Sequence, residues 1–115
     1  MRRDDGVLLD MVIAARRARH YLKGMTREEF EQSPLHQDAV EGRLIAIGSL
    51  TRSVSPFLRE SHPEIPWQEL AAMGNNRIVA EYFRLDTDAL WHTVQEELPP
   101  VMALIEALLP REAET

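Results

Sequence analysis

The sequence contains no cysteine, which excludes disulfide bonds, thiolate nucleophiles and metal sites built on thiolates. This absence is compatible with a reducing compartment, and we expect a cytoplasmic protein. No run of about 18 or more apolar residues occurs, and the start, MRRDDGVLLD, turns acidic where a signal peptide would be hydrophobic. We therefore expect neither a membrane span nor export.

Several chemical motifs are also missing. There is no glycine-rich phosphate loop, because Gly48 and Gly74 stand alone, and no serine lies in a recognisable nucleophile motif. None of the four histidines stands at metal-ligand spacing with another histidine or a pair of acids. Asp38 and Glu41 fall on one helix face, where we expect both to be exposed to solvent. The residues therefore predict no metal and no cofactor.

Positive charge is scarce, since the formal net charge is −6. Proteins that grip phosphates usually present a basic face, and here such a face can only be local. The one candidate is formed by Arg16, Arg17 and Arg19 on the first predicted helix, joined by Arg77 and Arg84. Their spacing alone favours a solvated helix face over a phosphate-binding surface.

The apolar periodicity indicates helices throughout the chain. Residues 5–23 have apolar positions at three- and four-residue spacing, and Gly24 is suited to end that helix. Thr26 and Glu29 form a capping-box pattern at the start of a short helix that Pro34 limits. A second long helix is expected over 35–60, kinked or broken at Pro56.

The second half is predicted to be helical as well. Residues 67–83 indicate one helix or two, with a bend at 74–76. Asp86 or Thr87 should cap a last helix that reaches residue 109 and is kinked by two adjacent prolines at 99 and 100. No stretch shows sustained strand alternation, so we predict an all-α fold in one domain, residues 1–115, with 111–115 as a loose tail. The long helices carry more apolar positions than one small bundle needs, which favours an isologous homodimer.

A resemblance to a known family rests on the stretch from His62 to Val101, HPEIPWQELAAMGNNRIVAEYFRLDTDALWHTVQEELPPV. It resembles the core of the HepT-like toxins of the HEPN superfamily, in which a Pro-Trp turn precedes a helix written roughly M-R-N-R-I-V-H-E-Y-F. A "D…W…V…LP" helix then follows. Upstream, LDM at 9–11, MTREEF at 25–30, QDAV at 37–40 and Ile47-Gly48 occur in the expected order, so the likeness covers about 105 residues.

The resemblance implies a HEPN-type bundle of about four to five helices that forms a homodimer. It implies a metal-independent RNA endonuclease whose signature is an arginine, four to six residues, a histidine, any residue and a tyrosine. Arginine and histidine from two subunits meet in a cleft at the dimer interface, where histidine can transfer a proton and arginine can hold the phosphate. The implied partner is a minimal nucleotidyltransferase of the MntA type, an antitoxin that transfers AMP to the signature tyrosine.

Carried over residue by residue, the signature is only partly present. Tyr82 matches the tyrosine and is the expected AMP acceptor, but Ala80 stands at the histidine position, and a methyl group cannot transfer a proton. The expected arginine would fall within 73–75, where no residue is basic, and Arg77 lies only three residues before Ala80. Ser49 also stands where a glutamate often follows the Ile-Gly pair. The candidate substrate-binding residues are Asn75, Asn76, Arg77 and Arg84, with Arg77 and Tyr82 as the remaining signature positions.

Three explanations are compatible with this pattern. The chain is a natural member that kept the fold and dimer but lost cleavage, or a toxin disarmed by a deliberate substitution at Ala80, against which the missing arginine argues. Alternatively, it is an active metal-independent ribonuclease with a noncanonical site built on Arg77, His20 or His92. A plain dimeric interaction module without RNA contact is a further alternative.

Each singled-out residue also has an ordinary structural interpretation. Tyr82 fits a half-buried aromatic with one hydrogen bond, and Arg77 fits an ion pair with Glu81 four residues later. Trp67 and Trp91 are expected to anchor the core or the dimer interface rather than to stack on bases.

Overall fold

The computed structural model of the chain is helical, and it describes residues 3–73, 78–79 and 84–110. The first half contains α1 (Arg3–Tyr21), α2 (Arg27–Glu31), α3 (Pro34–Thr51), α4 (Pro56–Ser61) and α5 (Trp67–Ala71). Two short strands follow, β1 (Ile78–Val79) and β2 (Arg84–Leu85). The second half ends with α6 (Thr87–His92), the π-helical segment η1 (Thr93–Glu97) and α7 (Leu98–Glu106). Within these residues the predicted all-α class is confirmed.

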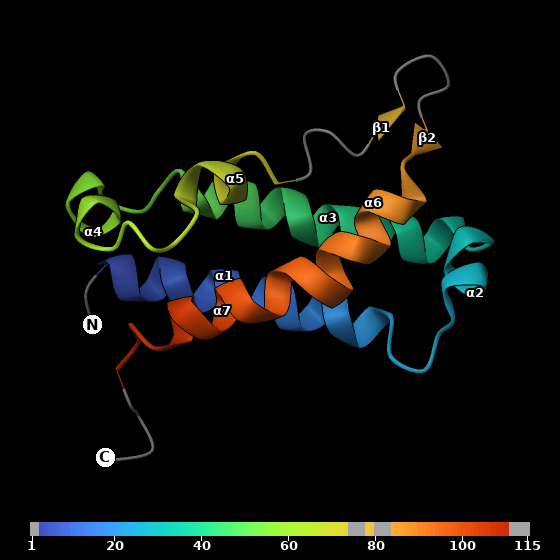
Figure 1. Cartoon of the computed structure of the whole chain (residues 1–115), viewed down its shortest axis with the longest axis horizontal. Coiled ribbons are helices and arrows are strands. Elements are labelled where there is room, and N and C mark those ends of the chain that lie inside the picture. The colour runs from blue at the N-terminus through green and yellow to red at the C-terminus, as the bar shows by residue number, and fades with distance from the viewer. Residues whose placement is uncertain (1–2, 74–77, 80–83, 111–115) are drawn as a thin grey trace.

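The long helices form a bundle around α1. Figure 1 shows α1 and α3 running antiparallel, with α7 lying along α1 and α2 closing the end at which α1 stops and α3 begins. The short helices α4 and α5 sit at the opposite end of α3 (Figure 1). None of the helices in the described ranges is long and apolar enough to cross a bilayer.

The connection from α1 to α2 has the local chemistry expected from the sequence. Gly24 adopts φ 77°, a left-handed conformation that suits glycine at a helix end. Thr26 Oγ1 accepts the backbone N–H of Glu29 at 3.1 Å, and the Glu29 carboxylate accepts the N–H of Thr26 at 2.8 Å. The predicted capping box is therefore confirmed.

The long helix expected over 35–60 was predicted to be kinked or broken at Pro56, and the structure has the break, because two separate helices stand there. α3 ends at Thr51 and α4 begins at Pro56. Ser55 adopts an extended conformation, caps α4 with its hydroxyl and bonds to Asp4 of α1, while Val54 is buried in the connection. Proline suits the first position of a helix, because the N–H that it lacks would have no partner within the helix there. Pro56 therefore begins α4 rather than lying inside α3.

Of the one or two helices expected over 67–83, the first is present from Trp67, but helix at 78–79 was wrong. α5 ends at Ala71, and Ile78–Val79 pairs antiparallel with Arg84–Leu85, with Ile78 opposite Leu85. The Gly-Asn-Asn sequence is a poor helix interior, and the β-branched pair that follows it favours extended backbone. This two-residue ladder leaves the helical class unchanged.

The last helix contains a local widening before its two prolines. Asp86 caps α6 through its side chain, as expected, and the helical path continues through the π segment into α7. Pro99 and Pro100 cannot donate to the carbonyls four residues earlier and their rings crowd them, so a wider π turn directly before them relieves the clash. The regular α-helix is thus interrupted before the prolines, whereas a kink at the prolines themselves stays a prediction.

The core is built from the inner faces of the long helices, with contributions from Phe30 of α2 and Leu70 of α5. Trp67 is 9% exposed, and the ring of Trp91 lies 5.7 Å from that of Phe30 at an angle of 45°. Both tryptophans therefore pack against the hydrophobic core. The largest fully buried side chains are Phe30, Leu8, Met11, Leu22, Leu44, Ile47, Ile65, Leu70, Leu90, Leu98, Ile105 and Val12.

Candidate functional site

The signature segment, residues 73–82, falls largely outside the described residues. Asn75, Asn76, Arg77, Ala80 and Tyr82 all belong to that undescribed part. For Arg84 the structure describes only the backbone, which lies in β2 opposite Val79. The structure therefore defines how the chain enters and leaves the segment, and the expectations for its side chains remain predictions.

The residues that lead into the signature segment pack against α3, and we call this contact the seat of the segment on α3. Gly48 is buried, and a Cβ at this position would lie 2.9 Å from the Met73 carbonyl oxygen and 3.0 Å from that of Ala71. One helical turn later, Arg52 Nη1 donates to the Ala71 carbonyl oxygen at 2.6 Å. The missing side chain at Gly48 thus lets the end of α5 approach the α3 backbone, and Arg52 satisfies one of its terminal carbonyls.

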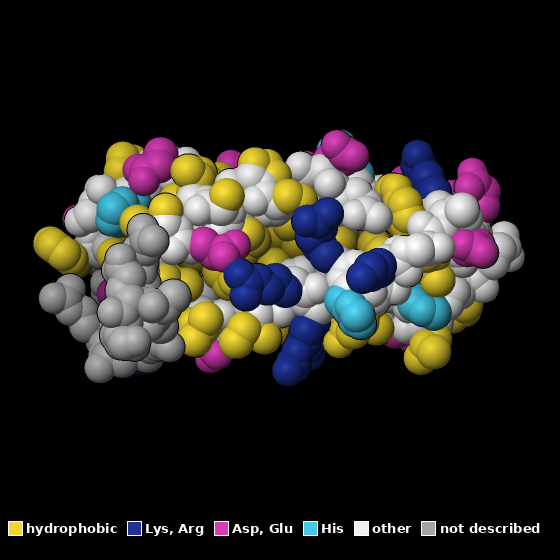
Figure 2. Space-filling view, turned by 90° about the horizontal axis from the view of Figure 1, so that it is seen from below, with side chains coloured by type: hydrophobic (Ala, Val, Ile, Leu, Met, Phe, Trp, Pro, Cys, Tyr) yellow, Lys and Arg dark blue, Asp and Glu magenta, His cyan; other side chains and the backbone are white. Residues whose placement is uncertain are grey.

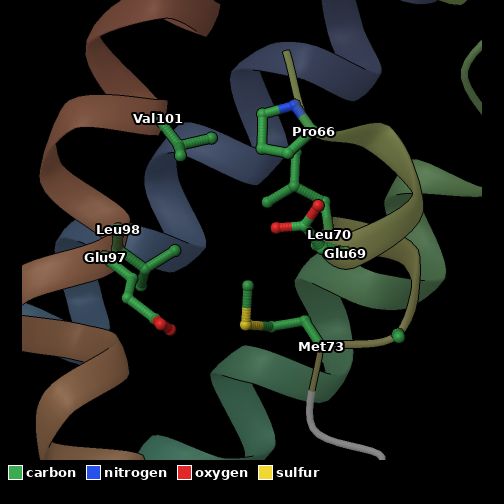
Figure 3. Close-up of a pocket in the computed structure, with 8 residues that line it drawn as sticks. Pro66, Glu69, Leu70, Met73, Glu97, Leu98 and Val101 are labelled. Atoms are coloured by element: carbon green, nitrogen blue, oxygen red, sulfur yellow. The ribbon is translucent and has the colours of Figure 1, made fainter.

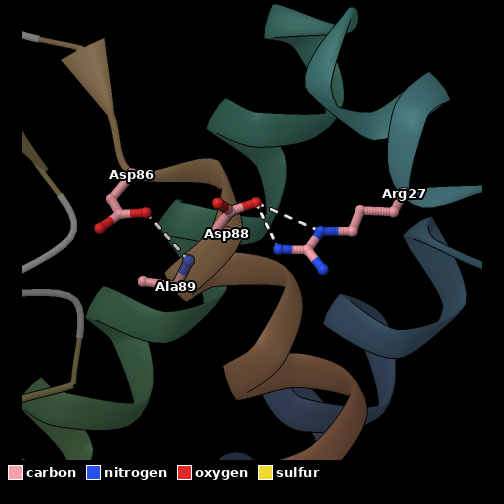
Figure 4. A network of polar contacts seen from close by, with 4 residues as sticks. All are labelled: Arg27, Asp86, Asp88 and Ala89. Atoms are coloured by element: carbon pink, nitrogen blue, oxygen red, sulfur yellow. Dashed lines mark hydrogen bonds and ion pairs between the residues drawn. The ribbon is translucent and has the colours of Figure 1, made fainter.

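The exit from the segment is fixed by two acidic residues at the start of α6 (Figure 4). Asp86 accepts the N–H of Ala89 at 3.0 Å, and Asp88 Oδ1 accepts Nη2 and Nε of Arg27 at 2.5 and 3.2 Å. The hydrogen bond and charge of Arg27 lower the pKa of the exposed Asp88 carboxyl. The pair joins α2 to α6, although its exposure limits what it adds to stability.

A pocket of about 470 Å³ opens beside the entry to the segment. Figure 3 shows Pro66, Leu70 and Met73 on one side and Leu98 and Val101 on the other, so that the walls are mainly apolar. Two carboxylates, from Glu69 and Glu97, stand at its walls (Figure 3). Their negative charge disfavours a phosphate in this pocket, so we do not assign it to RNA.

The predicted exposure of the two acids on α3 is half right. Asp38 is exposed, but Glu41 is only 6% exposed and lies on the buried face of the helix. The error arose because the helix face was judged from spacing, whereas burial depends on what packs against α3. A buried carboxylate is tolerated where polar groups compensate for the lost hydration.

The other titratable residues of the described part do not gather into one site. The ring nitrogens of His36, His62 and His92 lie 2.6 Å from Ser33 Oγ, 3.3 Å from Glu64 and 3.6 Å from Glu97, respectively. Within the described ranges, no group of three or more histidine or acidic residues is arranged to hold a metal ion. The sequence did not indicate the roles of two structural residues: Gly48 was seen only as an isolated glycine within an Ile-Gly pair, and Arg52 carried no signal at all.

Comparison with known proteins decides the family. The family model described as "Ribonuclease HepT-like" matches residues 11–108. The chain belongs to the HepT-like ribonuclease family. A protein named "Probable ribonuclease HepT" from Thermococcus cleftensis is 31% identical over 101 residues, which cover 88% of this chain and 91% of that protein. A protein named "Putative RNase TTE0752" from Caldanaerobacter subterraneus subsp. tengcongensis is 29% identical over 79% of this chain and 80% of its own length.

No solved structure matches the chain significantly. The residues matched by the HepT-like model include the whole signature segment, its seat on α3, the start of α6 that follows it, and most of α1. The family resemblance inferred from residues 62–101 is thereby confirmed, while the roles of the signature residues are not decided by the match.

Proposed function

We propose that this chain is the HepT-like component of a toxin–antitoxin pair that has kept RNA binding and lost RNA cleavage. One observation carries the proposal: Ala80 occupies the histidine position of the signature, and no arginine stands within 73–75. General acid–base catalysis needs a group that exchanges protons near neutral pH, and alanine has none. Both halves of the family's catalytic pair are therefore absent from this sequence.

The described backbone between these positions differs from the expected helix. The resemblance led us to expect a helix through the signature, whereas Ile78–Val79 lies in a strand paired with Arg84–Leu85. The seat on α3 and the start of α6 nevertheless hold both ends of the segment.

A noncanonical catalytic site built on the described histidines has little support. His36, His62 and His92 have separate neighbours, and His20 lies at the end of α1. Proton transfer requires the acid or base to lie within hydrogen-bond reach of the reacting group, and usually two such groups act together. Their dispersal favours the loss of cleavage over a replacement site.

The proposed homodimer is supported by apolar side chains left exposed on α3. Ile45 is 53% exposed and Leu35 is 76% exposed, although α3 also contributes to the core. Ile45 precedes Gly48 by three residues, about one helical turn, so an interface at Ile45 would adjoin the seat of the signature segment. That is the arrangement a family with a paired site requires.

The loss of cleavage is tested with tRNA and mRNA in the absence of added metal. We expect no cleavage by the unchanged chain. Ala80→His combined with Asn75→Arg restores both signature groups at the family spacing, and we expect this double variant to cleave RNA without metal. Cleavage by Ala80→His alone should be weaker or absent. Cleavage by the unchanged chain would contradict the proposal. If no variant cuts, the loss extends beyond these two positions.

The antitoxin partner is tested by AMP transfer to Tyr82. With a cognate MntA-type nucleotidyltransferase and ATP, we expect a mass gain of one AMP, because the tyrosine hydroxyl is the group that the family modifies. Tyr82→Phe lacks this hydroxyl and should gain nothing, whereas Tyr21→Phe is the control for loss of a different tyrosine. Modification that persists in Tyr82→Phe would show that the acceptor is another residue.

A further inference from the structure

Positive charge in this acidic chain is concentrated in residues 11–27. That stretch contains five of the 13 lysines and arginines and none of the 19 aspartates and glutamates. The buried residues of α1 in this stretch include Met11, Ala15 and Ala18, which point into the core. The cations therefore have to lie on the outer side of the helix.

Four exposed cations form what we call the α1 basic face: Arg16, Arg17 and Arg19 on α1, and Lys23 in the turn that follows it. Figure 2 shows lysine and arginine side chains gathered over the middle of the molecule, on the face that α1 presents. A shallow hollow of about 370 Å³ lies within this region, lined by Arg16, Arg19, His20 and Lys23 and by Gln95 of η1. Three of the four cations, all except Arg17, thus line a concave surface that has no acidic side chain among its lining residues.

Most of these cations are not engaged elsewhere in the described part of the molecule. Arg16 is the exception, since its Nη2 lies 2.6 Å from the carboxylate of Glu106 on α7. No hydrogen bond or ion pair joins Arg17, Arg19 or Lys23 to a side chain or backbone group of the described residues. Among the described residues, nothing competes with an external anion for these three side chains.

Stabilisation of the helix end explains only part of this face. Cations near a helix C-terminus interact favourably with its dipole, which accounts for Arg19 in the last turn. The carbonyls of Arg19 and His20 already accept the N–H groups of Leu22 and Lys23 at 3.1 Å, so the side chains are not needed to satisfy them. Arg16 and Arg17 precede the last turn, and the effect of the helix dipole is weak outside that turn.

We propose that the α1 basic face, whose residues lie outside the signature segment in the sequence, binds the phosphate backbone of single-stranded RNA. The inference rests on the proposed RNA-binding function and assigns it a second contact area. Guanidinium groups hold phosphates through paired hydrogen bonds, and a row of cations on one helix can follow successive phosphates. Glu106 limits this surface, because it neutralises Arg16.

The decisive measurement is the salt dependence of binding to a labelled oligouridylate, followed by fluorescence anisotropy. Arg19→Gln/Lys23→Gln should raise Kd about tenfold at low salt and reduce the slope of log Kd against log salt by about 1.4, since each phosphate contact on a single strand contributes about 0.7. Gln32→Glu/Gln68→Glu changes the net charge equally at exposed positions outside the face. This control should keep the wild-type slope.

A second variant tests the same surface in the opposite direction. Glu106→Gln releases Arg16, and we expect it to tighten RNA binding about threefold at low salt. Circular dichroism of each variant establishes that the helices are retained, which the exposure of all the altered side chains favours.

The outcomes separate this inference from the proposed function. If the unchanged chain binds no RNA at low salt, both fail. If it binds RNA but Arg19→Gln/Lys23→Gln keeps the wild-type affinity and slope, or the control loses as much, only the assignment of the α1 basic face is overturned. That assignment is also overturned if Arg19→Gln/Lys23→Gln loses the nucleotidyltransferase partner but keeps RNA binding, since the surface would then serve a protein.

Discussion

Asp4 joins the first turn of α1 to the start of α4 with both of its carboxylate oxygens. One oxygen accepts the Ser55 hydroxyl at 2.6 Å and the other accepts the Ser55 backbone N–H at 3.0 Å. The same hydroxyl accepts the N–H of Leu58 at 3.2 Å and thereby caps α4. These hydrogen bonds, first that of the Ser55 hydroxyl and then that of its N–H, lower the pKa of Asp4 below the ordinary value of 3.8.

We predict that this single carboxylate makes a pH-dependent contribution to stability. A pKa lowered in the folded state means that the contribution is present above the ordinary value and is lost as pH falls through the lower, folded value. Asp4→Asn should reduce the free energy of unfolding at neutral pH by no more than about 1 kcal/mol, because the group is partly solvated. The difference should vanish in acid. Urea unfolding from neutral to acidic pH measures it, and Asp10→Asn, an exposed change on the same helix, is the control. Equal effects of the two substitutions would contradict the assignment.

At the scale of single elements, two glycines of α3 have opposite surroundings. A Cβ on Gly48 would meet backbone oxygens of Met73 and Ala71 at 2.9 and 3.0 Å, whereas one on Gly42 would meet nothing within 4 Å. We predict that Gly48→Ala lowers the free energy of unfolding by about 1–3 kcal/mol, since backbone cannot move aside easily. Gly42→Ala should raise it by about 0.5–1 kcal/mol through helix propensity. Thermal and urea unfolding test both, and a stabilising Gly48→Ala would show that α5 does not need this close approach.

The elements that were predictable from the sequence are those with local causes. The capping box at Thr26 and Glu29 and the left-handed Gly24 depend on residues that are neighbours in the chain. The separation of α4 from α3 depends on Ser55 bonding to Asp4, 51 residues away, and spacing along the chain does not reveal such a partner. The same limit applies to the seat of α5 on Gly48, which was visible only as an isolated glycine.

At the scale of the whole molecule, the family and helical class were predictable because the motifs from residues 9 to 101 keep their order in the chain. The candidate site was predictable only as a pattern of present and absent residue types, with Tyr82 kept and Ala80 in place of histidine. Its surroundings depend on how α3, α5 and α6 converge, which is a property of packing. That Arg17, Arg19 and Lys23 have no ion-pair partner among the described residues likewise emerges only from the arrangement of the chain in space.

The assembly is the property of the whole molecule that now needs a test. Because Ile45 is 53% exposed on α3 and lies about one turn from the seat of the signature segment, we predict an isologous homodimer in which Ile45 is buried. Ile45→Arg places a charge at this interface, and we expect it to convert the dimer to a monomer, as measured by light scattering after size-exclusion chromatography.

The matched control places the same charge on another exposed apolar residue. Leu104 on α7 is 41% exposed, and Leu104→Arg should leave the dimer intact. Circular dichroism should show the same helix content for both variants, because both side chains already contact water. A monomeric unchanged chain would contradict the dimer itself. A dimer that survives Ile45→Arg but dissociates in Leu104→Arg would move the interface from α3 to α7, and the two signature segments would then no longer be expected to face one another.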